Sequence, residues 1–176
     1  LQKQKLKDPA FGYARDIPHL MNRLLPLLKV KKFKVVTNGG AVNPLACRDA
    51  VFAVAKKLGI SGLKIGVVMG DNILDNIDSL INEGVTLNNM ETGESVVTVK
   101  EKLLSANVYF GAAPIVEALR QGADIVITGR VTDTGLTLGP MIHEFGWNMN
   151  DWNKMAAGTV AGHIIECGGQ ASGGNF

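Results

Sequence analysis

The segment of residues 123–135, ADIVITGRVTDTG, contains residue types that could bind a ligand. Its apolar run, residues 125–127, predicts a buried strand, and Arg130 and Asp133 follow within a few residues. An arginine at the carboxyl end of a strand is suited to hold a phosphate or a carboxylate, because its guanidinium can donate two parallel hydrogen bonds. The two side chains could also simply pair with each other. We therefore treat Arg130 as a candidate anion ligand and Asp133 as a candidate catalytic carboxylate.

The other predicted strands also end in loops that contain glycine. Asn38 and Gly39 follow the first strand, with Asn43 a few residues later; Asp71 follows the second strand, and Gly111 the third. Glycine lets backbone amides approach a ligand closely, and the start of the next helix favours an anion. Each residue also has a structural alternative, since the glycines can serve turns and the polar residues can cap helices. Asp71 is the second candidate for a catalytic carboxylate.

Other chemical motifs are weak or missing. His163 and Glu166 stand three apart on a predicted helix, which suits a metal ligand pair or a proton relay, but also ordinary packing. The sequence contains no GxGxxG fingerprint, no GxxxxGK[ST] loop and no CxxC or Cys/His cluster. The sequence therefore assigns no metal, and it leaves the cofactor unknown.

Strands and helices alternate along the chain, and this order positions the candidate residues. The predicted strands are residues 33–37, 63–69 and 123–128, and residues 105–110 predict a short strand or an extended segment. The predicted helices are residues 16–30, 44–58, 74–83, 113–121, 134–144 and 151–167. Residues 94–100, ESVVTVK, alternate in places and predict an edge strand or hairpin, and residues 168–176 predict a loop.

Three of the strand segments, starting at Phe33, Leu63 and Ile125, are apolar runs without regular alternation. Such runs indicate burial on both faces, and hence a mostly parallel sheet with helices on both faces. We predict an α/β fold with Rossmann-like layers. Ligands of such sheets bind outside the carboxyl ends of the strands, where the candidate residues stand.

Length and composition narrow the classes of protein. The 176 residues, 46% of them hydrophobic, predict a single α/β domain spanning residues 1–176. A net charge of +2 gives no case for nucleic-acid binding, and no apolar run approaches the ~18 residues of a membrane span. Cys47 and Cys167 are predicted to be buried, reduced thiols, so we expect a cytoplasmic protein, or one of an organelle matrix. The chain begins without methionine and ends in a glycine-rich segment, so we expect part of a longer polypeptide. Separately, we expect a homo-oligomer.

Several long motifs, TNGGAVNP, VMGDN, SANVYFGAAPIVEAL, GRVTDTGL and ECGGQASGG, resemble the acyclic terpene utilisation family AtuA over essentially the whole chain. The resemblance implies a longer protein that acts in bacterial degradation of citronellol and geraniol through acyl-CoA intermediates, beside a biotin-dependent geranyl-CoA carboxylase. It implies no established catalytic residues. The family motifs and the strand-end argument coincide at Asn38, Gly39, Asn43, Asp71, Gly111, Arg130, Asp133, Glu166 and Gln170.

Together these observations predict an enzyme or enzyme-associated protein of branched or isoprenoid acyl-CoA catabolism. Arg130, with the amides around Gly39 and Gly111, would bind a phosphate or carboxylate, and Asp133 or Asp71 would orient a hydroxyl, a water or Arg130. Hydratase or lyase chemistry would suit such a set. Two alternatives remain open: a non-catalytic assembly subunit of a biotin-dependent acyl-CoA carboxylase, and a domain that binds a CoA metabolite without turnover.

Overall fold

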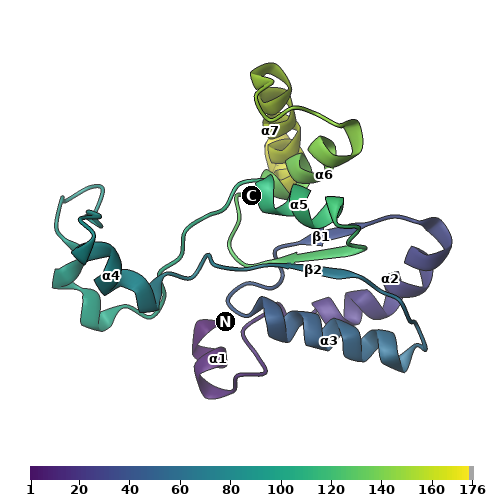
Figure 1. The fold of residues 1–176 in the computed structure, drawn as a ribbon, viewed down its shortest axis with the longest axis horizontal. Coiled ribbons are helices and arrows are strands. Elements are labelled where there is room, and N and C mark those ends of the chain that lie inside the picture. Colours follow the sequence, from purple (N-terminus) through teal and green to yellow (C-terminus); the bar gives the residue numbers. More distant parts are fainter. Residues whose placement is uncertain (175–176) are drawn as a thin grey trace.

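The computed structural model describes residues 1–174 and has a three-stranded parallel sheet at its centre (Figure 1). The strands are β1 (Val35–Thr37), β2 (Ile65–Val68) and β3 (Ile125–Thr128), in the spatial order β1-β3-β2. Val126 of β3 lies opposite Val36 on one side and opposite Gly66 on the other. The strand that leads to Arg130 is therefore the central one.

Helices cover both faces of the sheet, which confirms the predicted α/β class. On one face lie α2 (Ile17–Lys31) and α3 (Pro44–Lys57), and on the other lie α5 (Ala113–Arg120) and α6 (Gly135–Phe145) (Figure 1). Ile125 and Ile127 pack in the cluster under α2 and α3, whereas Val126 packs in the cluster under α5. Because both faces of β3 are covered, its apolar run shows no polar alternation.

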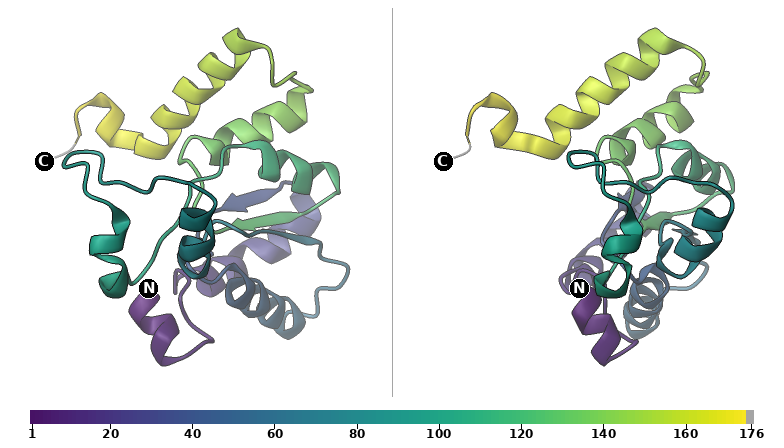
Figure 2. Two further views of the ribbon diagram at one scale, coloured as in Figure 1. Left: turned by 60° about the vertical axis from the view of Figure 1, so that its left-hand side comes forward. Right: turned by 90° about the vertical axis from the view of Figure 1, so that its left-hand side faces the viewer.

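The helix α7 (Trp152–Cys167) crosses α6 and rises away from the sheet (Figures 1 and 2). Two glycines allow the close crossing: a Cβ on Gly162 would lie 2.8 Å from the carbonyl oxygen of Thr134, and a Cβ on Gly158 would lie 2.6 Å from Leu138. The crossing brings the last turns of α7 to the start of α6, just after Asp133.

Of the two alternatives for residues 105–110, the structure shows the extended segment and not a strand of the sheet. This segment forms only single bridges, Asn107 with Asn72 and Phe110 with Val131, and does not join the sheet. The segment runs past the carboxyl ends of the strands. Its Asn107 pairs with the segment after β2, and its Phe110 pairs with the segment after β3. The position of Asn107 beside Asp71 follows from this path.

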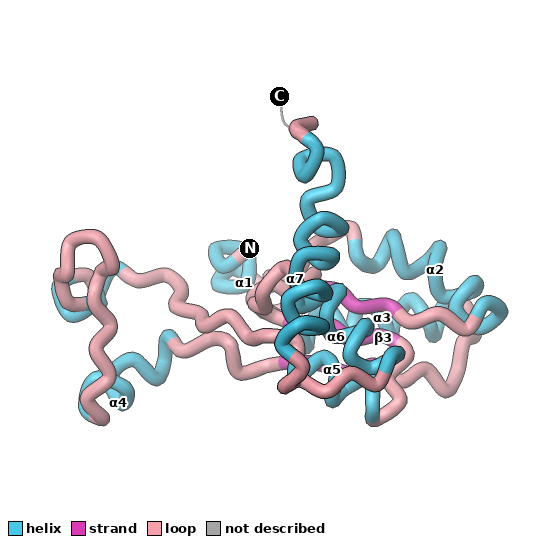
Figure 3. The backbone as a smooth tube through the Cα atoms, turned by 90° about the horizontal axis from the view of Figure 1, so that it is seen from above, coloured by secondary structure: helices cyan, strands magenta, loops and turns pink. Residues whose placement is uncertain are grey.

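Residues 72–107 form a protruding segment that we call the arm. Of the edge strand or hairpin predicted at residues 94–100, only one antiparallel bridge forms, at Ser95. The arm contains η1 (Leu74–Asn76), α4 (Ile77–Asn82), η2 (Val96–Thr98) and η3 (Lys100–Lys102). Asn88 and Ser95 make one isolated bridge around a turn, in which the Asn89 side chain accepts hydrogen bonds from two backbone amides. Figures 1 and 3 show the arm reaching away from the sheet and its helices.

The two ends of the described chain are also helical. The helix α1 (Gln2–Lys7) precedes α2, and η4 (Gly168–Ser172) follows α7. The predicted loop over residues 168–176 is therefore wrong for its first five residues, because they continue α7 as a short 3₁₀ turn; residues 175–176 lie outside the described residues.

Candidate functional site

The carboxyl ends of β2 and β3 bring Asp71 and Arg130 together. The carboxylate of Asp71 is buried, with 5% of the residue exposed. Its Oδ2 accepts one hydrogen bond from the backbone N–H of Arg130 at 3.0 Å and another from the amide group of Asn107 at 2.9 Å. Asp71 therefore fixes the direction in which the chain leaves β3, and with it the origin of the Arg130 side chain.

Glycine is required where this carboxylate meets the central strand. A Cβ on Gly129 would lie 2.4 Å from Oδ1 of Asp71, closer than any side chain tolerates. Gly40, in the loop after β1, meets the same strand end from the other side, where a Cβ would lie 2.5 Å from the carbonyl oxygen of Thr128. The two glycines let the chain segments around the end of β3 pack closely together.

The guanidinium of Arg130 is held by an aromatic side chain. Its central carbon lies 4.8 Å from the centre of the Tyr109 ring, and its Nε donates a hydrogen bond of 3.0 Å to the Tyr109 hydroxyl, to which Nη2 also donates. Arg130 does not pair with Asp133, and among residues 1–174 no carboxylate forms an ion pair with it. The positive charge at the end of β3 is therefore positioned but not neutralised.

The predicted glycine and asparagine ligands occupy different environments. The N–H of Gly39 donates to the Thr37 hydroxyl at 3.0 Å and its carbonyl accepts from Ala14 at 2.8 Å, so the protein itself uses both groups. Asn38 lies in the same turn and is half-buried. Gly111, by contrast, is exposed: a Cβ added there would meet no atom within 4 Å, and the helix that follows has no side-chain cap.

Asn43 has a structural role. Its Oδ1 accepts a hydrogen bond from the N–H of Ala46 and so caps α3, and its Nδ2 donates to the carbonyl groups of Pro9 and Phe11, each at 2.7 Å. These contacts tie the segment before α2 to the start of α3. The capping alternative is thus the one that the geometry shows.

A second polar cluster lies at the end of α7. The Cys167 thiol donates to Oε2 of Glu166 at 3.3 Å and lies 3.5 Å from Nε2 of His163. The hydrogen bond to Glu166, followed by partial burial and the negative charges of Glu166 and Asp133, raises the pKa of the Cys167 thiol. The cluster therefore favours the protonated thiol, and the negative charge of Asp133 acts in the same direction.

The thiols differ from the prediction of two buried cysteines. Cys47 is fully buried in the core under α2 and α3, and this burial raises its pKa to about 11. Cys167 is only half-buried, because it ends the last turn of α7 beyond α6.

Gln170, the last of the predicted ligand-binding residues, is exposed in η4. Within residues 1–174, no three His, Cys, Asp or Glu side chains are arranged to hold a metal ion.

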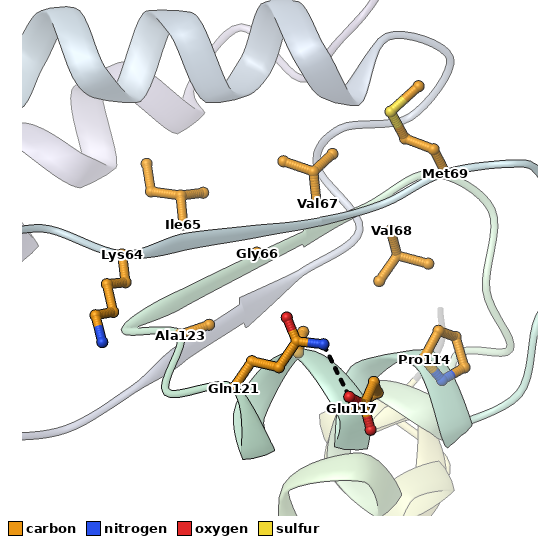
Figure 4. Close-up of a pocket in the computed structure, with 11 residues that line it drawn as sticks. Lys64, Ile65, Gly66, Val67, Val68, Met69, Pro114, Glu117, Gln121 and Ala123 are labelled. Carbon is orange, nitrogen blue, oxygen red and sulfur yellow. Dashed lines mark hydrogen bonds between the residues drawn. The ribbon is translucent and has the colours of Figure 1, made fainter.

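A groove of about 390 Å³ runs beside this edge, between the outer edge of β2 and the helix α5 (Figure 4). Val68 points from the strand towards α5, where Glu117 accepts a hydrogen bond of 2.8 Å from Gln121. Met69 and Pro114 line the end of the groove nearest the strand ends. Neither Asp71 nor Arg130 lines it, so the Arg130 site is an open surface beside a groove lined by both apolar and polar side chains.

Sequence reasoning misses two residues of this site. Asn107 and Tyr109 stand inside the segment predicted as a strand or an extended segment, whereas the other candidates follow a predicted strand. A signal is present in the sequence, because both are polar residues shortly before Gly111.

Comparison with known proteins assigns the family. Residues 1–176 match the family model described as "Acyclic terpene utilisation family protein AtuA". The chain belongs to the AtuA family. The match covers the whole chain and confirms the resemblance that the motifs indicated, so this AtuA chain is implicated in acyclic terpene utilisation. No curated protein and no solved structure shows significant similarity to it. Among the helices of the described residues, none is long and apolar enough to span a membrane.

Proposed function

We propose that this AtuA chain binds the anionic part of an acyl-CoA or a small carboxylate of acyclic terpene catabolism at the carboxyl ends of β2 and β3. The observation that carries the proposal is the state of Arg130. Its guanidinium stands at the end of the central strand, is oriented by Tyr109, and has no carboxylate partner among the described residues. Strand ends of parallel sheets are where ligands bind, and an oriented guanidinium suits phosphate and carboxylate groups.

In this proposal Asp71 does not contact the ligand, and its role is to position Arg130. One carboxylate oxygen of Asp71 is engaged by Arg130 and Asn107, so Asp71 positions the arginine backbone rather than competing for its guanidinium. Preorganised groups bind more tightly because less freedom is lost when the ligand arrives. Gly111 contributes an open approach at the start of α5, whose first turn has no side-chain cap.

The apolar part of the ligand fits the groove beside β2. Its end at Met69 and Pro114 lies just before Asp71 and just after Gly111 in the chain, next to the proposed anion site. A branched acyl chain can bury apolar surface there while its charged end stays near Arg130. Asp133 and Glu166 belong to the second cluster and would meet the ligand only if it extends towards α7.

The proposal is tested by thermal unfolding with free CoA, geranyl-CoA, related branched acyl-CoAs and the matching free acids. A ligand at ~100 times its dissociation constant stabilises by about 2.7 kcal/mol, which is a measurable rise in the midpoint. We expect a rise that is lost in Arg130→Ala. Arg15→Ala is the matched control, because Arg15 also lies over an aromatic ring, that of Phe11, at 5.0 Å. No rise with any compound, or a rise that Arg130→Ala keeps, contradicts the proposal.

A second candidate function, assembly with a biotin-dependent acyl-CoA carboxylase, is favoured by the outer face of α7. Val160, Ile164 and Ile165 are 59%, 54% and 66% exposed there, which is unusual for aliphatic side chains on one helix. In that case Val160→Asp/Ile164→Asp abolishes binding to purified carboxylase subunits, and Arg130→Ala leaves it unchanged. If neither the wild-type chain nor the variants bind the purified subunits, this candidate is rejected.

A further inference from the structure

The arm, residues 72–107, has almost no core of its own. All of its residues are described, and of these only Ile77 is buried. Its helix α4 packs against the preceding turn η1, and no described element of the arm packs closely on a helix or strand outside it. Exposed apolar side chains instead line it: Val85, Met90, Val97, Val99 and Leu104. A segment that buries so little cannot offset the entropy of its own ordering, so it needs a surface to pack on.

The arm is also strongly acidic. It carries six acidic residues against two lysines, a net charge of about −4. All six acidic side chains, Asp75, Asp78, Glu83, Glu91, Glu94 and Glu101, are exposed. Within the described residues, only the pair between Lys100 and Asp78 neutralises one of them. The surface that receives the arm must therefore be positively charged.

The first 34 residues supply such a surface within the same chain. They carry nine lysines and arginines against Asp8 and Asp16, although the whole chain has a net charge of only +2. Exposed cations include Lys3, Lys7 and Arg23, and none of them forms an ion pair among the described residues. The charges of this protein are thus separated between an acidic arm and a basic region, residues 1–34, which contains α1 and α2.

The basic region also exposes apolar side chains. The helix α1 buries none of its residues, and Leu6 is 67% exposed; on α2, Leu20 and Leu27 are 41% and 48% exposed. An interface needs such apolar contacts inside a polar and charged rim. The basic region therefore matches the arm in both charge and apolar surface.

From this match we propose that two copies of this chain associate by placing the arm of each copy on the α1–α2 region of the other. The arm reaches away from its own sheet and helices (Figures 1 and 3), so a second copy can receive it without refolding either chain. Exchange of identical elements between two copies is a closed, two-fold arrangement that leaves no further arm free. The inference does not depend on the proposed ligand, because it uses none of the residues around Arg130.

The test measures the mass of the protein by sedimentation equilibrium, with charge-reversed variants on each side. Asp75→Lys/Glu91→Lys changes the arm, and Lys3→Glu/Lys7→Glu changes α1; none of these side chains makes a hydrogen bond or ion pair among the described residues. We expect a dimer for the unchanged chain and a dissociation constant raised by about tenfold or more in each variant. The arm variant loses the net charge of about −4, and the substituted positions of each variant face like charges. Lys56→Glu/Lys57→Glu, in the last turn of α3, is the matched control and leaves the dimer intact.

The most specific test is to mix the arm variant with the α1 variant and measure their association. The reversed arm of one variant then meets the reversed α1 of the other, so the mixture forms a heterodimer more tightly than either variant forms a homodimer. A monomeric unchanged chain overturns the proposal, and so does a dimer whose dissociation constant neither variant changes. A mixture that associates no better than its components overturns it as well. If the protein is a monomer and the charge-reversed variants lower its unfolding midpoint, the proposal is also overturned, because the arm then packs on its own chain.

Discussion

At the scale of single residues, the site depends on the carboxylate of Asp71, which has a structural role. Asp71 is buried and accepts hydrogen bonds from the Arg130 backbone and from Asn107. Removing the Asp71 carboxylate leaves the Arg130 backbone N–H and the Asn107 amide without this acceptor, which is costly. Arg130, on the other hand, is held by Tyr109 through contacts that leave its charge available. The division of roles between Asp71 and Arg130 is the feature that favours binding of an anion.

Gly129→Ala tests whether the close contact with Asp71 matters. The added methyl group would lie 2.4 Å from the Asp71 carboxylate, so either the carboxylate or the strand end must move. We expect a loss of about 1–3 kcal/mol in the free energy of unfolding, measured in urea, together with weaker ligand binding. Gly111→Ala is the control, because its methyl group meets no atom within 4 Å. Equal stability of the two variants would show that Asp71 is not held as described.

Glu166→Gln tests the environment of the Cys167 thiol. The hydrogen bond to the Glu166 carboxylate favours the protonated thiol, so it raises the pKa, and thiolate forms only as the pH rises further. Replacing the charge by an amide lowers the pKa, and we expect iodoacetamide to label Cys167 faster and at lower pH. Cys47, whose burial raises its pKa to about 11, stays unlabelled in the folded chain. An unchanged or slower labelling rate would contradict the assigned hydrogen bond.

At the scale of elements, caps and crossings place the site. Asn43 joins the start of α3 to the segment before α2, and the glycines of α7 let it cross α6 closely. β3 is covered on both faces and holds the sheet together. These contacts place the elements around the sheet, and the Asp71 carboxylate then fixes the start of the segment that carries Arg130.

Asn43→Ala separates the capping role from a ligand role. The change removes the cap of α3 and two further hydrogen bonds to backbone carbonyls, so we expect a loss of about 1–3 kcal/mol in the free energy of unfolding. Ligand-induced stabilisation should remain, because the side chain is occupied by protein groups. Asn38→Ala is compared in the same urea titration and should cost much less. Loss of ligand binding in Asn43→Ala without loss of stability would favour the ligand role instead.

The sequence predicts an element correctly where the neighbouring residues alone determine its structure. The apolar run of β3, the proline and asparagine at the start of α3, and the arginine after β3 are all evident from neighbouring residues. The sequence cannot decide between a strand and an extended segment at residues 105–110, because a β-prone segment does not reveal whether a partner strand is available. Asn107 and Tyr109 are missed for the same reason, since their contacts join positions 21 to 36 residues away.

At the scale of the whole molecule, charge and exposed apolar surface are unevenly distributed. The arm is acidic and extended, whereas α1 and α2 are basic and only partly covered. That residues 1–176 form a single domain stays a prediction, as does the cytoplasmic location. The net charge of +2 conceals this separation, because composition sums over the chain and loses the position of each charge.

The central claim is that Arg130 holds the anionic part of an acyl ligand, and calorimetric titration with geranyl-CoA tests it most directly. The unchanged chain, Arg130→Ala and Arg15→Ala are titrated at two salt concentrations. We expect binding by the unchanged chain and by Arg15→Ala that weakens with salt, and a dissociation constant raised by about tenfold or more in Arg130→Ala, because a charge-assisted contact is lost. Equal affinity of Arg130→Ala and the unchanged chain would contradict the claim.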